Sequence, residues 1–191
     1  TGFWGRNHSR VLAELHNTRL VAVCDIDEAQ AQDVAKRHDA EWHSKDEELL
    51  HRKDIDAVCI CTPTTTHATI ALRAITNGKH LLIEKPIAHN IEAAKKIVDA
   101  SVSTDLRIMT GFIERFNPGV QRLRKMIQQG TLGDIVLTFA RRVGRWPERI
   151  GDVGVVKDSA IHDLDLMRYL FKEEPRSVYA RAGSLGHRFE D

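Results

Sequence analysis

Net charge and long apolar runs are both missing from this sequence. Lysine and arginine together number 28 and aspartate and glutamate 27, so the formal net charge is +1. This balance provides no general electrostatic attraction to nucleic acid or to an anionic membrane. The longest apolar runs, such as LVAVC and HLLI, have the length of a strand and are too short to span a bilayer. We therefore expect neither nucleic acid nor a membrane as a partner.

Cysteine is also scarce. The three cysteines, Cys24, Cys59 and Cys61, form no C-x-x-C pair. Cys59 and Cys61 alternate along an expected strand, where small buried thiols are common. A metal or redox role is the weaker interpretation, so no metal site is predicted. Since no signal peptide is visible and free thiols suit a reducing compartment, we expect a cytoplasmic protein.

Strand and helix signals alternate through the first 112 residues. Three polar residues, Asp27, Ser44 and Asn90, precede helical patterns as caps, and Glu47 completes a capping box with Ser44. Apolar strands separated by helices indicate an α/β domain whose parallel sheet is covered on both faces. The expected strands span 19–25, 56–63, 80–86 and 107–112, and the expected helices span 4–16, 28–38, 45–52, 64–77 and 91–101.

The pattern changes after residue 112. Asn117 as a cap, Pro118 at the first position and Gly130 as a stop predict a helix between them. A second helix is expected over 158–171. Longer, partly polar runs at 133–144 and 177–184 are typical of strands in an open, mostly antiparallel sheet. We expect two domains, an α/β domain over 1–112 and the start of an α+β substrate domain over 113–191.

The opening stretch, TGFWGRNH, places Gly2 and Gly5 directly before a helix, as in the second half of a G-x-G-x-x-G fingerprint. A tight turn there lets a diphosphate approach bare backbone at a helix N-terminus. Asp25 ends the next strand, about 20 residues later, where an acid binds the adenine ribose. A carboxylate at that place repels a 2′-phosphate, which predicts NAD rather than NADP. The alternative is that the glycines are accidental and Asp25 merely ends a strand.

Five motifs, GFWGRNH, CTPTTTH, EKP, RFNP and DSAIHDLD, together resemble the glucose-fructose oxidoreductase, inositol dehydrogenase and MocA family, in the family's order. The resemblance implies a Rossmann-type doubly wound sheet and a homo-oligomer, either a dimer or a tetramer. Members of this family begin with a strand and a first glycine ahead of the position of Thr1. The sequence therefore resembles a member without its first strand and without most of its second sheet. Because that first strand is central, we expect its neighbours to be unpaired.

The resemblance also implies a set of cofactor-binding residues. For His67, a role in a polar cluster that caps a helix is an equally good interpretation. Glu84 is expected to contact the nicotinamide side or to pair with a neighbouring group, and Pro86 is expected to carry a cis bond. The implied cofactor-binding residues are Gly2, Phe3, Trp4, Gly5, Asp25, Thr62, Pro63, His67, Glu84 and Lys85.

Hydride transfer from a secondary alcohol needs a general base and a group that holds the hydroxyl. Lys85 follows a parallel strand at its carboxyl end, where α/β sheets bind ligands. Asp158 and His162 are four residues apart on a helix and share a side. The resemblance implies a proton relay through Lys85, a substrate hydroxyl bound by Asp158, and His162 as base or relay. The alternatives are that Lys85 is an ordinary surface lysine and that Asp158 and His162 form an exposed carboxylate–imidazole pair at a helix start. Many relatives have a glycine pair before this aspartate, whereas this sequence has Lys157, whose charge would alter the environment of Asp158.

A basic stretch, ARRVGRWPERIGD, follows the first expected strand of the second domain. Arginine forks suit a diphosphate and Trp146 could stack on a ring. The stretch resembles the family branch that oxidises UDP-N-acetylglucosamine or its uronic acid at the 3-hydroxyl. Alternatives are an inositol or free-sugar dehydrogenase, another Rossmann reductase, and a non-catalytic dinucleotide sensor. The expected substrate-binding residues are Arg115, Asn117, Arg141, Arg142, Trp146, Asp158 and His162, whereas Asp163 and Asp165 are expected to be structural.

Overall fold

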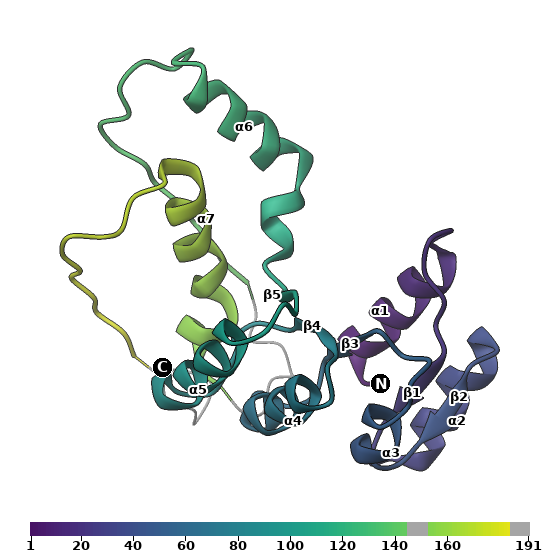
Figure 1. Ribbon diagram of the computed structural model, residues 1–191. Coiled ribbons are helices and arrows are strands. Elements are labelled where there is room, and N and C mark those ends of the chain that lie inside the picture. Colours follow the sequence, from purple (N-terminus) through teal and green to yellow (C-terminus); the bar gives the residue numbers. More distant parts are fainter. Residues whose placement is uncertain (145–152, 184–191) are drawn as a thin grey trace. The chain divides into compact units, whose positions relative to one another are not determined.

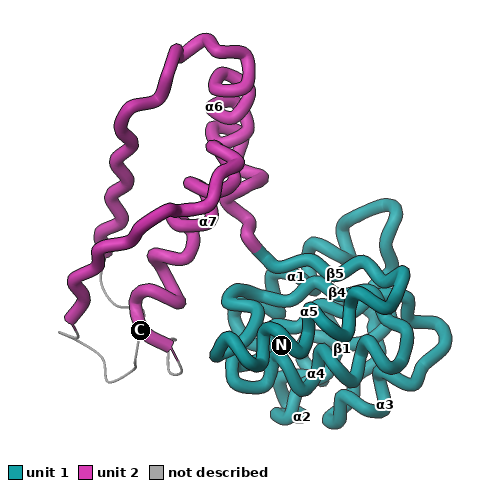
Figure 2. The backbone as a smooth tube through the Cα atoms, turned by 60° about the vertical axis from the view of Figure 1, so that its left-hand side comes forward, with its two compact units in different colours: residues 1–111 teal, residues 112–191 magenta. Residues whose placement is uncertain are grey.

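The computed structural model describes residues 1–144 and 153–183 (Figure 1). The chain divides into two compact units, residues 1–111 and residues 112–191, which Figure 2 draws in separate colours. Each unit is described by itself below.

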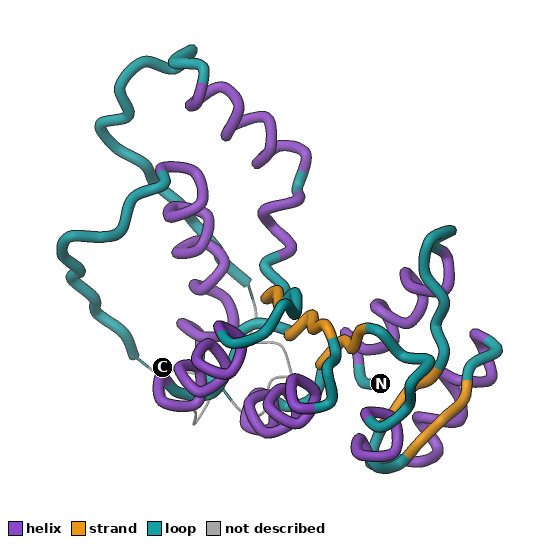
Figure 3. Tube along the Cα trace, in the orientation of Figure 1, coloured by secondary structure: helices purple, strands orange, loops and turns teal. Residues whose placement is uncertain are grey.

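The first unit alternates helices and strands, as Figure 3 shows. Every strand pair in it is parallel, which confirms the predicted α/β class. One strand was not predicted, because its three residues, EWH, form no apolar run. The strands are β1 (Ala22–Cys24), β2 (Glu41–His43), β3 (Ala57–Ile60), β4 (His80–Ile83) and β5 (Ile108–Thr110), and the helices are α1 (Phe3–Glu14), α2 (Glu28–His38), α3 (Asp46–Leu50), α4 (Thr64–Thr76) and α5 (Ile91–Val102).

The strands form two separate sheets, β1-β2 and β3-β4-β5. In the part of the chain that the structure describes, β1 and β3 do not pair with each other. A cavity of about 500 Å³ is lined by residues of both strands, among them Val23 and Ile60, and by the inner side of α1. This arrangement matches the expectation that the neighbours of a central strand are left unpaired.

The core of the first unit lies between the three-stranded sheet and its helices. Ile60 and Ile83 from adjacent strands are buried together with Ile97 of α5. Ala71 and Ala74 of α4 have no exposed surface, and α4 contacts both β3 and β4. Small side chains on this face let α4 approach the strands closely, and each fully buried isoleucine contributes about 1.5–3 kcal/mol.

Two of the three helix caps predicted for the first unit are present. The Asp27 carboxylate accepts the N–H of Gln30 at 3.1 Å, and the Asn90 side chain accepts the N–H of Ala93 at 2.8 Å, so both predicted caps are confirmed. The Ser44 prediction is wrong. The cap position of α3 is occupied by Lys45, which makes no side-chain cap, and three acids in the first turn offset the helix dipole instead.

The second unit contains a 3₁₀ turn (Ile113–Phe116), α6 (Pro118–Gln128), a π-helical turn (Val156–Ala160) and α7 (Ile161–Phe171). The Asn117 side chain accepts the N–H of Gly119 at 2.9 Å, and Gly130 has a φ of +68° after α6. The predicted start and stop of this helix are therefore confirmed. Among the described residues, no helix is long and apolar enough to cross a membrane.

The strands predicted at 133–144 and 177–183 are wrong for this structure. Neither segment is a strand, and apolar side chains within them lie exposed: Val136 at 94%, Phe139 at 83% and Tyr179 at 93%. A strand needs a hydrogen-bonded neighbour, and two such segments alone make only a marginal sheet. The described residues of the second unit contain no other strand to serve as that neighbour.

Candidate cofactor and catalytic site

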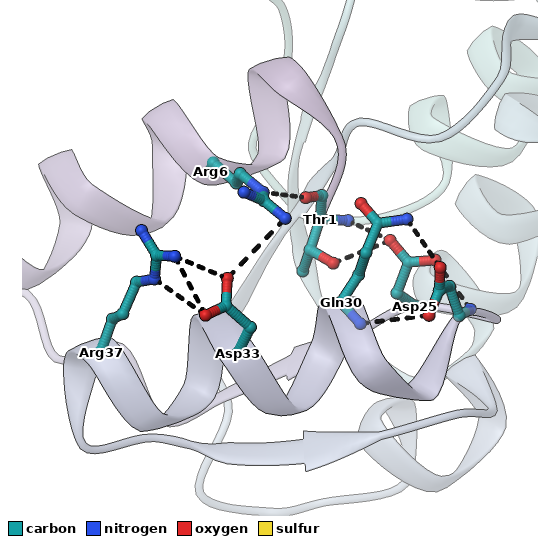
Figure 4. A network of polar contacts seen from close by, with 7 residues as sticks. Thr1, Arg6, Asp25, Gln30, Asp33 and Arg37 are labelled. Carbon is teal, nitrogen blue, oxygen red and sulfur yellow. Dashed lines mark hydrogen bonds and ion pairs between the residues drawn. The ribbon is translucent and has the colours of Figure 1, made fainter.

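Asp25 lies directly after β1 and faces the start of α1 (Figure 4). Its Oδ2 atom accepts hydrogen bonds from the amino group of Thr1 at 2.6 Å and from the Thr1 hydroxyl at 2.8 Å. Its Oδ1 atom accepts the N–H of Asp27 at 3.0 Å. Since Thr1 immediately precedes Gly2, the structure brings the opening glycine turn and the predicted ribose acid together.

The electrostatics of Asp25 suit an acceptor of hydroxyl donors. Burial raises the pKa of the carboxyl, but hydrogen bonds from the Thr1 amino group, the Asp27 N–H and the Thr1 hydroxyl outweigh burial and hold the pKa below its usual range. The group is therefore an acceptor-only carboxylate near neutral pH. One of its oxygens accepts the Thr1 hydroxyl, and a ribose hydroxyl is a donor of the same kind, so the chemistry of this carboxylate fits the ribose of a dinucleotide.

The glycines at the start of α1 have no packing explanation within the protein. A Cβ on Gly2 would meet nothing within 4 Å, and one on Gly5 would lie 3.8 Å from the Cβ of Cys61, an ordinary contact. Phe3 is exposed and makes an edge-to-face contact with Trp4, with ring centroids 5.3 Å apart. The open space beside Gly2 is what a phosphate group approaching a helix N-terminus needs.

The loop after β3 places His67 in the protein interior. The residue is 1% exposed, its Nδ1 lies 2.9 Å from the Pro86 carbonyl oxygen, and its Nε2 lies 2.9 Å from the Thr62 carbonyl oxygen. Thr62 and Pro63 are exposed, and Pro63 takes the cap position of α4 without a side-chain cap. The His67 ring therefore contacts backbone at both nitrogens, while Thr62 and Pro63 have open surface for a ligand.

Glu84 and Lys85 lie on the turn after β4. Glu84 is 7% exposed, and its Oε1 lies 2.8 Å from Nε2 of His8. Of the two expectations for Glu84, pairing with a neighbouring group is the one the structure shows. The Lys85–Pro86 bond is cis, as predicted, and Lys85 is half-buried.

His8 was missed by the sequence analysis. The motif GFWGRNH contains it, but no pattern connects it with Glu84, 76 residues away. The available signal is its spacing: His8 follows the buried Gly5 by three residues and so lies on the same, inward face of α1. Thr1, just before α1, thus contacts Asp25, and His8, in the first half of α1, contacts Glu84.

In the second unit, Asp158 and His162 lie on one continuous helical segment, as predicted. Asp158 is 5% exposed, belongs to the π-helical turn, and accepts the Ser159 hydroxyl at 3.1 Å. His162 is half-buried in the first turn of α7. Single π-helical turns occur frequently at functional sites, because they re-aim side chains on one face of a helix.

Two of the three arginines predicted to bind substrate, Arg115 and Arg142, have protein partners. Arg115 donates from Nε to Asp165 at 2.8 Å, and Asp165 is 5% exposed, which gives that acid the structural role expected of it. Arg142 donates to Asp163 at 3.0 Å and lies 3.6 Å from Glu114. The Asn117 side chain caps α6, and Arg141 is exposed. Trp146 lies outside the described residues.

Replacing Arg115 by methionine is expected to lower the free energy of unfolding by about 3 kcal/mol, because the buried Asp165 carboxylate would lose its charged partner. Urea unfolding measures the change. Arg122→Met, on the exposed side of α6, is the control and should stay within about 0.5 kcal/mol. Adding Asp165→Asn to Arg115→Met should recover part of the loss; equal stability of Arg115→Met and Arg122→Met would contradict the assignment.

The cysteines are free thiols. Burial raises the pKa of Cys59 to about 11 and that of Cys61 to about 12, so both stay protonated near neutral pH. Among residues 1–144 and 153–183, no cluster of three or more His, Cys, Asp or Glu side chains could hold a metal ion.

The fold and the residues at its carboxyl edge define an NAD-binding Rossmann oxidoreductase domain. Residues 1–112 match the family model described as "Oxidoreductase family, NAD-binding Rossmann fold", and residues 120–191 match the "GFO/IDH/MocA C-terminal domain". The chain belongs to the Gfo/Idh/MocA family.

Several relatives carry more specific names. An inositol 2-dehydrogenase of Rhizobium meliloti (strain 1021) is 36% identical over 187 residues, which cover 95% of this chain and 56% of the relative. One of Rubrobacter xylanophilus is 34% identical over 184 residues, covering 95% and 53%. The crystal structure of myo-inositol dehydrogenase from Lactobacillus casei with NAD(H) and myo-inositol has a TM-score of 0.80 at 29% identity, covering 91% and 53%. The chain spans about half the length of these relatives.

Proposed function

We propose that this protein is an NAD-dependent dehydrogenase that oxidises a secondary hydroxyl group of a cyclic polyol of the inositol type. The observation that carries the proposal is Lys85, an amine on the turn after β4, at the carboxyl edge of a parallel sheet. The names of the relatives support the substrate class, since two of them, 36% and 34% identical, are inositol 2-dehydrogenases.

The proposed roles follow the chemistry of each group. Bound NAD would supply the hydride acceptor for the carbinol carbon. The hydroxyl proton leaves to the Lys85 amine, or to His162 as base or relay, while Asp158 accepts a hydrogen bond from the substrate hydroxyl. Asp25 binds the adenine ribose, and the backbone at Gly2 lies against the diphosphate.

A sugar nucleotide remains a second substrate class, and the exposed Arg141 is the observation that favours it. The support is weaker than the basic stretch suggests, because Arg142 is already paired with Asp163 and Glu114. A non-catalytic sensor would need neither Lys85 nor the pair formed by Asp158 and His162.

A substrate panel tests the proposal. With NAD, NADH formation is followed for myo-inositol, scyllo-inositol, glucose and UDP-N-acetylglucosamine, and NADH binding is titrated separately. We expect an inositol to have a kcat/KM at least about 10-fold above the others, the discrimination that a few pocket contacts provide. Turnover confined to UDP-N-acetylglucosamine would overturn the substrate class. NADH binding without any turnover would indicate the sensor.

A further inference from the structure

We propose that His8 and His67 are positioning residues that hold the backbone on both sides of Lys85. The two histidines come from different helices, α1 and α4, and each contacts a neighbour of Lys85 in the sequence. His8 contacts the side chain of Glu84, and His67 contacts the carbonyl group of Pro86. The inference rests on the role proposed above for Lys85.

The His8 contact is partly buried. The side chains of His8 and Glu84 are only 20% and 9% exposed, and the ring nitrogen lies 2.8 Å from the carboxylate. A buried carboxylate needs a donor to offset its lost hydration, and His8 supplies one. The other carboxylate oxygen of Glu84 accepts the backbone N–H of Lys85 at 3.3 Å. A chain of contacts therefore runs from α1 through Glu84 to the backbone of Lys85.

Gly111, directly after β5, closes the other side of the Glu84 carboxylate. A Cβ at this position would lie 3.2 Å from three atoms of the carboxyl group, which is tighter than nine in ten real Cβ contacts, so the carboxylate would have to shift. Gly111 is itself held, because its N–H donates to the carbonyl group of Ile83 at 2.8 Å. The carboxylate thus lies between His8 and the backbone of Gly111, and only a glycine at position 111 leaves room for it.

The His67 contact ties two loops together. One ring nitrogen faces the carbonyl oxygen of Pro86 and the other faces that of Thr62, each at 2.9 Å, and the ring is 1% exposed. The loop after β3 is thereby linked to the turn after β4. Side chains locked by packing and hydrogen bonds of this kind set the position of a reacting group, and a misplacement of about 1 Å costs about 100-fold in rate.

The test compares substitutions of His8, the more accessible of the two histidines. His8→Ala is expected to lower kcat with NAD and inositol about 10- to 100-fold, counted per NADH-binding site, with less than about a 3-fold change in the KM for NAD. His8→Gln, whose amide can donate to Glu84, should restore kcat to within about 3-fold of the parent. His16→Ala, in the exposed turn after α1, is the control. An unchanged kcat per site in His8→Ala, or no recovery in His8→Gln, would overturn the inference.

Two further substitutions keep the test decisive if His8→Ala folds poorly. Gly111→Ala pushes directly on the Glu84 carboxylate, and His67→Phe keeps an aromatic ring but can donate to neither carbonyl group. Each should lower kcat per NADH-binding site, whereas a purely structural role would change only the number of such sites. A parent value of kcat per site in either variant would overturn the role of the residue that it disturbs, Glu84 for Gly111→Ala and His67 for the His67 variant.

An NMR readout separates failure of this inference from failure of the proposed function. The Lys85 backbone N–H donates to Glu84, so its resonance should shift in His8→Ala and stay in place in His16→Ala, even in a protein that turns over no polyol. An unmoved Lys85 resonance in His8→Ala would overturn the inference independently of any activity.

Discussion

Replacing Lys85 by methionine is expected to lower kcat with NAD and inositol about 1000-fold, within the 10²- to 10⁴-fold range of general acid–base catalysis. Methionine keeps an unbranched side chain of similar length but cannot carry a proton. The backbone N–H of Lys85, which donates to Glu84, is retained. The turn after β4 should therefore keep its geometry, and the loss should fall on the chemical step.

Steady-state kinetics and NADH titration together check this result. The Kd for NADH should change less than about 3-fold, because the amine acts on the substrate hydroxyl. Lys95→Met, on the exposed face of α5, is the matched control and should behave like the parent. Turnover within about 10-fold of the parent would rule out Lys85 as the proton carrier. A large rise in the NADH Kd would assign it to cofactor binding instead.

Replacing Asp25 by alanine is expected to weaken NADH binding about 10- to 100-fold, since a hydrogen bond to a charged group contributes about 1.5–3 kcal/mol. The carboxylate is ionised near neutral pH, because hydrogen bonds from Thr1 and Asp27 lower its pKa more than burial raises it. Removing its charge also removes repulsion of a 2′-phosphate. The affinity for NADPH should then stay constant or rise, and the preference for NADH should shrink.

Asp33→Ala is the matched control for Asp25→Ala. Asp33 belongs to the same polar network in Figure 4, where it pairs with Arg37 at 2.9 Å and with Arg6 at 3.7 Å. Its ion pairs are with these two arginines rather than with Thr1, so its loss should leave the ratio of NADH to NADPH affinity near that of the parent. A ratio unchanged in Asp25→Ala would remove Asp25 from the cofactor site and return it to the alternative interpretation, an acid that merely ends a strand.

Short-range chemistry explains which parts of the fold were predictable. The caps at Asp27, Asn90 and Asn117 each join residues at most three apart, and each was predicted and is present. The parallel α/β order followed from apolar runs and helix signals along the chain. By contrast, β2 escaped prediction because its residues EWH, of which Glu41 and Trp42 are exposed, carry no apolar pattern; pairing with β1 makes it a strand.

Long-range contacts explain what was missed or wrong at the site. His8 and Glu84 are 76 residues apart, and Arg115 and Asp165 are 50 apart. Neither pair can be found from spacing, because the distance between such residues depends on how the elements pack. The predictions that Arg142 is available to a diphosphate and that Arg115 binds the substrate overlooked the acids that lie beside each of them, Asp163 and Asp165.

Family membership, the α/β order and the candidate residues Asp25, Lys85, Asp158 and His162 are thus encoded locally, since motifs and periodicity depend on neighbours along the chain. The tertiary structure decided which of the polar side chains already have partners within the protein. It enclosed the His67 ring between two carbonyl groups and placed His8 against Glu84. It also left 133–144 without a strand, because backbone hydrogen bonds between strands form only where a neighbour is present. A sequence motif can identify a polar residue as a candidate for binding, but its burial and its partners in the folded protein determine whether it can still bind a ligand.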